Sequence, residues 1–151
     1  MSVVSVDTDY GNLTVTVTSD FDAPVERVWE LWSDPRKLER WWGPPSHPAT
    51  FETHNLVPGG QVRYFMISPE GDKHRGLWRV TAVNPPIGLQ FDDVYTDADG
   101  EPSTDLPATR VSIQLIGREG GTRMVMRSEL HSREDLERWL SLVESASLLR
   151  T

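Results

Sequence analysis

The sequence predicts an α+β domain in which a mostly antiparallel sheet carries its helices on one side. Three observations support this prediction. A pair of tryptophan-rich helical patterns follows an alternating strand near the N-terminus, and a series of segments with alternating hydrophobicity occupies the middle of the chain. An amphipathic helical pattern then ends it. The 151 residues fit one domain of ordinary size, spanning 1–151.

The first strand and the helix pair are read from local patterns. Asn12–Asp20 alternates aliphatic residues with threonines, which predicts a half-buried strand. Pro24 then stands in the first turn of a helix whose apolar residues recur at intervals of three and four. Asp34-Pro35 starts a second short helix, and Gly43-Pro44-Pro45 ends it. We expect this pair to cover a large apolar surface, because it contains Trp29, Trp32, Trp41 and Trp42.

From Ala49 onward the hydrophobic period changes to two, which predicts six further strands. Turns that contain proline and glycine join several of them, and strands joined by short turns pair in the antiparallel sense. The predicted strands are Ala49–Leu56, Gln61–Ser68, His74–Val83, Gly88–Tyr95, Thr109–Ile116 and Thr122–His131.

A final helix is predicted after Ser132, which would cap it, with acidic residues in the first turn where the helix dipole favours them. Extending from Arg133 to Arg150, it would reach about 27 Å. Each large apolar side chain that it buries would contribute about 1.5–3 kcal/mol, so we expect it to dock on the sheet. Its apolar stripe consists of Leu136, Trp139, Leu140 and Val143, with Ser147 as its continuation.

Composition and charge exclude several classes of partner. The formal net charge of −8 disfavours nucleic acid and anionic membranes, because phosphate binding needs a basic patch. No run approaches the roughly 18 apolar residues of a membrane span. The N-terminus lacks the features of a secretory signal, so we expect a cytoplasmic location. The absence of cysteine excludes disulfides, thiolate nucleophiles and cysteine-based metal centres.

The sequence contains no motif for a nucleotide cofactor or a metal ion, so we expect neither a cofactor nor a metal. There is no GxGxxG, P-loop or GxSxG pattern. Asp97 begins a stretch like a calcium loop, but a loop of about twelve residues would need a closing glutamate where Ala108 stands. A solvated acidic loop is therefore favoured. Surface positions are favoured for the four histidines, which match no zinc spacing: His47, His54, His74 and His131.

The order of elements, with WELWSDPRKLERWWGPP, NLVPGG and VNPPIGLQF at their positions, resembles the SRPBCC (START-like, Bet v 1-like) superfamily. Within it, the chain is similar to the group named for the C-terminal domain of the activator of heat-shock-protein-90 ATPase. Two departures are Asn55 and Val57, where members often carry an acidic residue and an arginine. The last helix also lacks the Gly-Trp pair that opens it in many members.

The resemblance implies a helix-grip fold, in which a curved antiparallel sheet of about seven strands wraps around a long C-terminal helix. Two short helices follow the first strand, and many members hold an apolar cavity between sheet and helix. Members bind lipids, sterols, polyketides and plant hormones, and a minority are cyclases or other enzymes. No universal catalytic residue accompanies the fold.

The register of the family predicts which side chains face this cavity. On the strand Gln61–Ser68 it favours Val62, Tyr64 and Met66. Methionines and large aromatics suit a pliable pocket, while ordinary core packing is the alternative interpretation. The candidate ligand-binding residues are Trp32, Tyr64, Met66, Trp78, Phe91, Asp93, Met126, Leu136, Trp139, Leu140 and Val143.

Asp93 is the polar residue with the clearest potential role, because it continues an inward-facing pattern. A carboxylate among aromatics would have a raised pKa and could orient a ligand or act as an acid or base. We favour the alternative that the strand ends near Asp92 and leaves both carboxylates in water, since carboxylates are rarely buried without partners. The catalytic candidates are Asp93, Tyr64 and His74.

Three functions remain open from the sequence. The first is binding of a hydrophobic or amphipathic small molecule, which could be lipid-, polyketide- or aromatic-like. The second is an enzyme of the polyketide cyclase, aromatase or hydrolase type in the same cavity, which needs convergent polar groups. The third, from the family name alone, is a co-chaperone-like module acting on heat shock protein 90. Exposed edge strands would allow a homodimer.

Overall fold

The computed structural model of the protein describes residues 2–43, 45–103 and 107–145. Its strands form one antiparallel sheet of eight, in the order β1-β2-β8-β7-β6-β5-β4-β3. The elements in chain order are β1 (Ser2–Asp9), β2 (Thr14–Phe21), α1 (Val25–Ser33), α2 (Pro35–Leu38), β3 (Ala49–His54), β4 (Gln61–Ile67), β5 (Lys73–Asn84), β6 (Gly88–Val94), β7 (Thr109–Arg118), β8 (Gly121–Glu129) and α3 (Arg133–Ser145).

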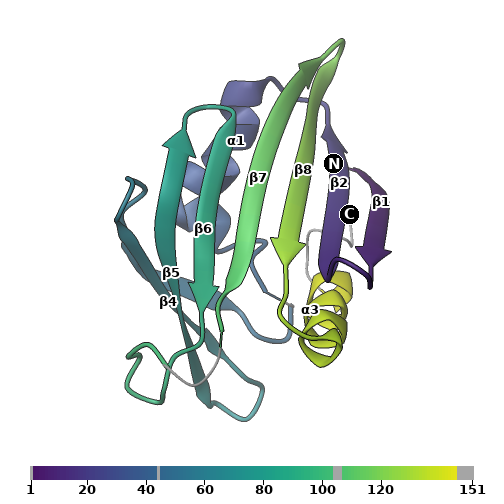
Figure 1. The fold of residues 1–151 in the computed structure, drawn as a ribbon. Helices are drawn as coiled ribbons and strands as arrows, with labels where there is room; N and C mark the ends of the chain where they lie inside the picture. The colour runs from purple at the N-terminus through teal and green to yellow at the C-terminus, as the bar shows by residue number, and fades with distance from the viewer. Residues whose placement is uncertain (1, 44, 104–106, 146–151) are drawn as a thin grey trace.

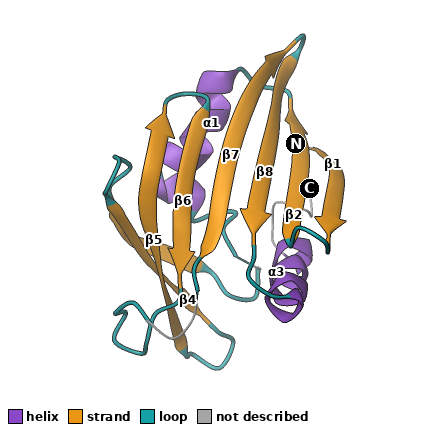
Figure 2. Cartoon of the chain, viewed as in Figure 1, coloured by secondary structure: helices purple, strands orange, loops and turns teal. Residues whose placement is uncertain are grey.

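The predicted α+β class and helix-grip arrangement are confirmed. In Figure 1, α1 lies behind the sheet and α3 lies beside the lower ends of β2 and β8. Strands from β3 to β8 follow one another in space as they do in sequence, whereas β2 pairs with β8. The segment that contains α1 and α2 therefore carries the chain from β2 to the far edge of the sheet (Figure 2).

One strand was missed by the prediction of about seven. β1 forms the outer strand of a hairpin with β2, in a register that places Ser2 opposite Asp20 and Asp9 opposite Thr14. A bulge between Val3 and Ser5 interrupts this register, so the alternating pattern that announces a strand is too short to recognise. The two short helices consequently follow the second strand rather than the first.

α3 begins as predicted. The hydroxyl oxygen of Ser132 accepts the backbone N–H of Asp135 at 3.1 Å, which satisfies a free donor of the first turn. Leu136 and Val143 are buried, while Trp139 and Leu140 are partly buried and pack against the core, so the predicted apolar stripe is confirmed. The predicted continuation of the helix through Ser147 to Arg150 lies outside the described residues.

An aromatic cluster fills the interior between the helices and the sheet. Trp32, the last large residue of α1, is fully buried, and its indole N–H donates to the sulfur of Met124 at 3.3 Å. Trp78 and Phe91 stack with ring centroids 4.0 Å apart. Trp42 meets Trp78 edge-on at 4.8 Å. The segment that follows α2 is therefore held against β5 and β6 by ring contacts.

None of the helices within the described part of the chain is long and apolar enough to span a bilayer.

Candidate ligand-binding pocket

A pocket of about 110 Å³ lies between α3 and the inner face of the sheet. Residues from β4, β6, β8, α3 and the segment after α2 surround it. Its wall is almost entirely apolar and aromatic, and Asp93 supplies the one carboxyl group that the described residues contribute to it. The lining residues are Trp41, Trp42, Gly43, Tyr64, Met66, Asp93, Met126, Trp139, Leu142 and Val143.

Tyr64 reaches the centre of this wall because a glycine stands beside it. Its register partner on β5 is Gly76, and a Cβ at that glycine would lie 2.2 Å from Tyr64 Cζ and 2.5 Å from Tyr64 Oη. The phenol ring therefore crosses β5 over the bare glycine backbone. This path lets Tyr64 Oη donate a hydrogen bond to Asp93 Oδ1, on β6, at 3.4 Å.

Replacing Gly76 by alanine should force the Tyr64 ring off this path and lower the free energy of unfolding by about 1–3 kcal/mol, the usual cost of overpacking. Denaturant unfolding measures this loss. The matched control is Gly117→Ala in β7, where a new Cβ would meet only Val25 Cγ2, at an ordinary 3.6 Å. In a Tyr64→Val background the penalty of Gly76→Ala should largely disappear, and a penalty that persists would show that Tyr64 is not its cause.

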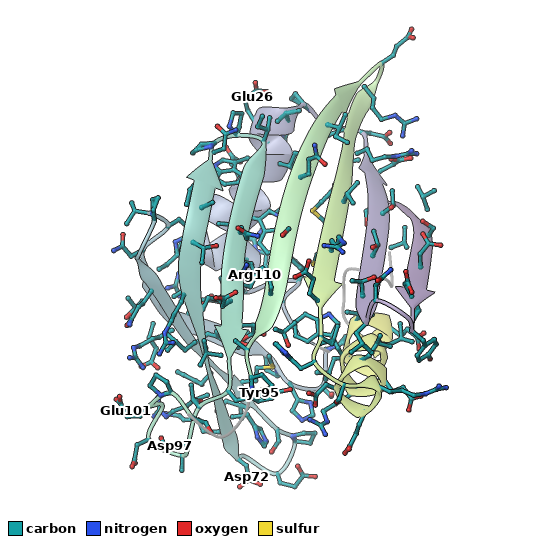
Figure 3. The ribbon with its side chains drawn as sticks, viewed as in Figure 1. Glu26, Asp72, Tyr95, Asp97, Glu101 and Arg110 are labelled. Carbon is teal, nitrogen blue, oxygen red and sulfur yellow. The ribbon has the colours of Figure 1, made fainter. Side chains whose placement is uncertain are left out.

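Asp93 and its neighbour Asp92 point to opposite faces of β6. Asp92 Oδ1 accepts the Nε–H of Arg110 at 3.0 Å, and Figure 3 shows Arg110 on the face turned away from α1. Asp93 lines the pocket instead. The favoured expectation that the strand ends here and leaves both carboxylates in water is wrong, because β6 continues to Val94 and is paired on both sides.

Burial governs the electrostatics of the Asp93–Tyr64 pair. Asp93 is half-buried in the pocket wall, and desolvation raises its pKa from 3.8 to about 7, although the hydrogen bond from Tyr64 acts in the opposite direction. The pKa of Tyr64 is raised well above its usual value, first by burial and then by the charge of Asp93. Tyr64 therefore stays protonated and acts as a donor to Asp93.

Three buried indole N–H groups in and beside the pocket have no hydrogen-bond partner within the described part of the chain. They belong to Trp42, Trp78 and Trp139. The rings of Trp42 and Trp78 meet the Tyr64 ring edge-on, with centroids 6.1 Å apart in each pair.

The sequence-predicted ligand-binding residues divide into two groups. Those that line the pocket are Tyr64, Met66, Asp93, Met126, Trp139 and Val143. The others contribute to the core against which the pocket is built: Trp32, Trp78, Phe91 and Leu136 are fully buried, and Leu140 is partly buried.

Four lining residues were absent from the predicted set: Trp41, Trp42, Gly43 and Leu142. The WWGP block contains the first three, and its aromatic density after a capped helix was the signal that could have placed them. Leu142 lies off the apolar stripe of α3 and is 48% exposed, so helical periodicity assigns it to solvent.

None of the four histidines lines the pocket. His74, a catalytic candidate, is exposed on β5 and stands outside the pocket, with its ring 6.0 Å from that of His47. Within residues 2–43, 45–103 and 107–145, no group of three acidic or histidine side chains is arranged to hold a metal ion.

The Asp97 carboxylate accepts the backbone N–H groups of Asp99 and Glu101, so it closes its own turn in the exposed loop at the lower end of the sheet (Figure 3).

Comparison with known proteins identifies the family of this chain and solved structures that are similar to it. The model of the family described as Activator of Hsp90 ATPase homolog 1-like protein matches residues 22–144. A crystal structure of a protein from Mycobacterium smegmatis is 44% identical, with a TM-score of 0.85, over 97% of this chain and 91% of that chain. A solution structure of a protein from Arthrobacter aurescens is 43% identical, with a TM-score of 0.86, over 95% of this chain and 84% of that chain.

A more distant crystal structure, of the AHSA1 protein from Silicibacter pomeroyi, is 23% identical with a TM-score of 0.75, over 91% of this chain and 92% of that chain. It shows the same fold. A search of curated proteins finds no match. The family match covers most of the chain, from before α1 to the last turn of α3. The chain therefore belongs to the Activator of Hsp90 ATPase homolog 1-like family.

Proposed function

We propose that the protein binds a hydrophobic or amphipathic small molecule in the pocket between α3 and the sheet. The supporting observation is the pocket itself, an apolar space of about 110 Å³ beside Trp139. Protein interiors leave few voids larger than a water molecule, and apolar cavities of about 150 Å³ accept benzene. A space of this size and lining suits a small ring or a branched alkyl group.

The lining favours an aromatic-like or polyketide-like guest over a long lipid chain. Trp42, Tyr64 and Trp139 present flat aromatic surface, and Met66 and Met126 can adapt to irregular shapes. The proposal places this binding in the cytoplasm, where the sequence predicts the protein to be, and it does not require the homodimer that exposed edge strands would allow.

Titration with ethylbenzene tests the proposal. We expect saturable shifts in the NMR signals of the Met66 and Met126 methyl groups, because both side chains line the pocket. Val143→Phe should weaken binding about tenfold or more, since the added ring would occupy the pocket. The matched control is Val57→Phe, which adds the same ring at a side chain that is 48% exposed and away from the pocket.

Native mass spectrometry of freshly purified protein gives an independent test. A co-purified organic mass that Val143→Phe no longer retains would support binding. If neither ethylbenzene nor benzylamine shifts any pocket signal, the proposed function is wrong.

The Asp93–Tyr64 pair favours an enzyme as the second candidate. A carboxyl group with a pKa of about 7, hydrogen-bonded to a tyrosine inside an apolar pocket, is suited to transfer a proton near neutral pH. A cyclase, aromatase or hydrolase would lose turnover in both Asp93→Asn and Tyr64→Phe, while His74→Gln would retain it. Binding without conversion across a panel of aromatic polyketides and esters would contradict this candidate.

The co-chaperone alternative rests on the family description. Capture of heat shock protein 90 by ligand-free protein, undiminished by Val143→Phe, would favour it over binding in the pocket.

A further inference from the structure

We infer that the molecule bound in the pocket is a largely apolar amine whose ammonium group pairs with Asp93. This inference rests on the proposed function and names the chemical class of its ligand. It follows from the carboxyl group of Asp93 in the pocket wall, from the ion pairs that Asp92 and Asp20 form elsewhere on the sheet, and from the aromatic rings around the pocket.

Asp93 lacks the partner that comparable carboxylates of this sheet possess. Asp92, the adjacent residue, pairs with Arg110 at 3.0 Å, and Asp20 pairs with Arg118 at 2.7 Å and with Arg123. Within the described part of the chain, Asp93 forms no ion pair, although it is set in an apolar wall. Among the described residues, none that lines the pocket carries a positive charge. A buried carboxylate is costly without a counter-charge, so the group that completes this site is a cation.

The hydrogen bond to Asp93 is also compatible with an ionised carboxylate. Tyr64 Oη donates to Asp93 Oδ1. The raised pKa of Tyr64 keeps this group protonated, so it meets Asp93 as a donor. A carboxylate accepts several hydrogen bonds, so Oδ2 of Asp93 can accept from an ammonium N–H.

The aromatic wall is compatible with the same ligand. Trp41, Trp42, Tyr64 and Trp139 line the pocket, and aromatic rings attract an ammonium group that lies over their faces. An anionic guest would meet the charge of Asp93 with no counter-ion. A neutral hydrocarbon would fit the apolar part of the pocket but would leave Asp93 unpaired.

Three probes of similar size separate these alternatives: benzylamine, which is protonated at neutral pH, its neutral isostere ethylbenzene, and benzoate. At about pH 8, NMR titration of the wild-type protein should show that benzylamine binds about tenfold or more tightly than ethylbenzene, with benzoate the weakest. Asp93→Asn should bring the affinities for benzylamine and ethylbenzene close to parity. The control Asp92→Asn should preserve the preference, because it alters the opposite face of β6.

The outcomes are distinguishable. If ethylbenzene binds as tightly as benzylamine, or benzoate binds best, the inference is overturned and the proposed binding function stands. If no probe binds, the proposed function fails and the inference fails with it. A preference for benzylamine that persists in Asp93→Asn also overturns the inference. Even if a variant does not fold, a wild-type ranking without a preference for benzylamine overturns the inference.

Discussion

Replacing Trp32 with alanine is expected to lower the free energy of unfolding by about 3–5 kcal/mol, because it removes a fully buried indole from the centre of the fold. The ring meets Trp41 edge-on at 4.7 Å and lies 6.3 Å from both Trp42 and Phe91. It therefore joins α1, the segment after α2, and the sheet. Removing it would leave a cavity beneath the wall of the ligand pocket.

Denaturant unfolding followed by circular dichroism measures this loss. Trp29→Ala is the matched control, since Trp29 lies on the same helix but is only partly buried against the core. We expect the control to cost clearly less. Equal losses at the two positions would show that α1 is held by its general apolar surface rather than by the contacts of Trp32.

The fold could be predicted because most of its segments follow simple periods. The strand alternation that places Val62 and Tyr64 inward and Arg63 outward is set by the two-residue period of a strand. The same period puts Val111 and Ile113 on one face of β7, and both are buried. β1 escaped prediction because its bulge breaks the alternation between Val3 and Ser5.

The pocket was harder to predict because it depends on contacts between distant segments. Asp93 was expected in water, since a single sequence does not show that β6 is covered at this point by Tyr64, which is 29 residues earlier. Tyr64 itself needs Gly76 beneath its ring. Trp78 and Phe91 were predicted to line the cavity, but they stack on each other and are sealed within the core.

Asp93 should make the protein less stable as pH rises from about 4 to about 7. The pKa of this carboxyl is raised in the folded state to about 7, so between these values the folded protein binds more protons than the unfolded chain. The free energy of unfolding therefore falls across this window and levels off above it. Such a pKa difference corresponds to about 4 kcal/mol at most, and water that enters the pocket would lower the penalty.

Asp93→Asn removes the carboxyl group and keeps its shape, so it should be more stable than the wild-type protein at about pH 8 and similar to it at about pH 4. Asp93 is hydrogen-bonded to Tyr64 of β4 and is paired in register with Trp78 of β5 and Thr109 of β7. It shares the pocket wall with Met126 of β8 and Trp139 of α3, and of these five residues only Tyr64 titrates. Because its pKa is raised, Tyr64 remains neutral throughout the window. The measurement is the difference in unfolding free energy between variant and wild type as a function of pH, which cancels the contribution of other carboxylates.

Asp92→Asn provides the matched control, because it removes an ion pair with Arg110 on the outer face and should not reproduce the gain at high pH. A difference between Asp93→Asn and wild type that stays flat from about pH 4 to about pH 8 would mean that Asp93 is as well solvated as an ordinary surface carboxylate. Saturation with benzylamine should reduce the disadvantage of the wild-type protein at high pH, because the bound ammonium would compensate the charge of Asp93. That reduction would show that the charge of Asp93, which destabilises the ligand-free protein at high pH, is the same charge that attracts the ammonium group of the ligand.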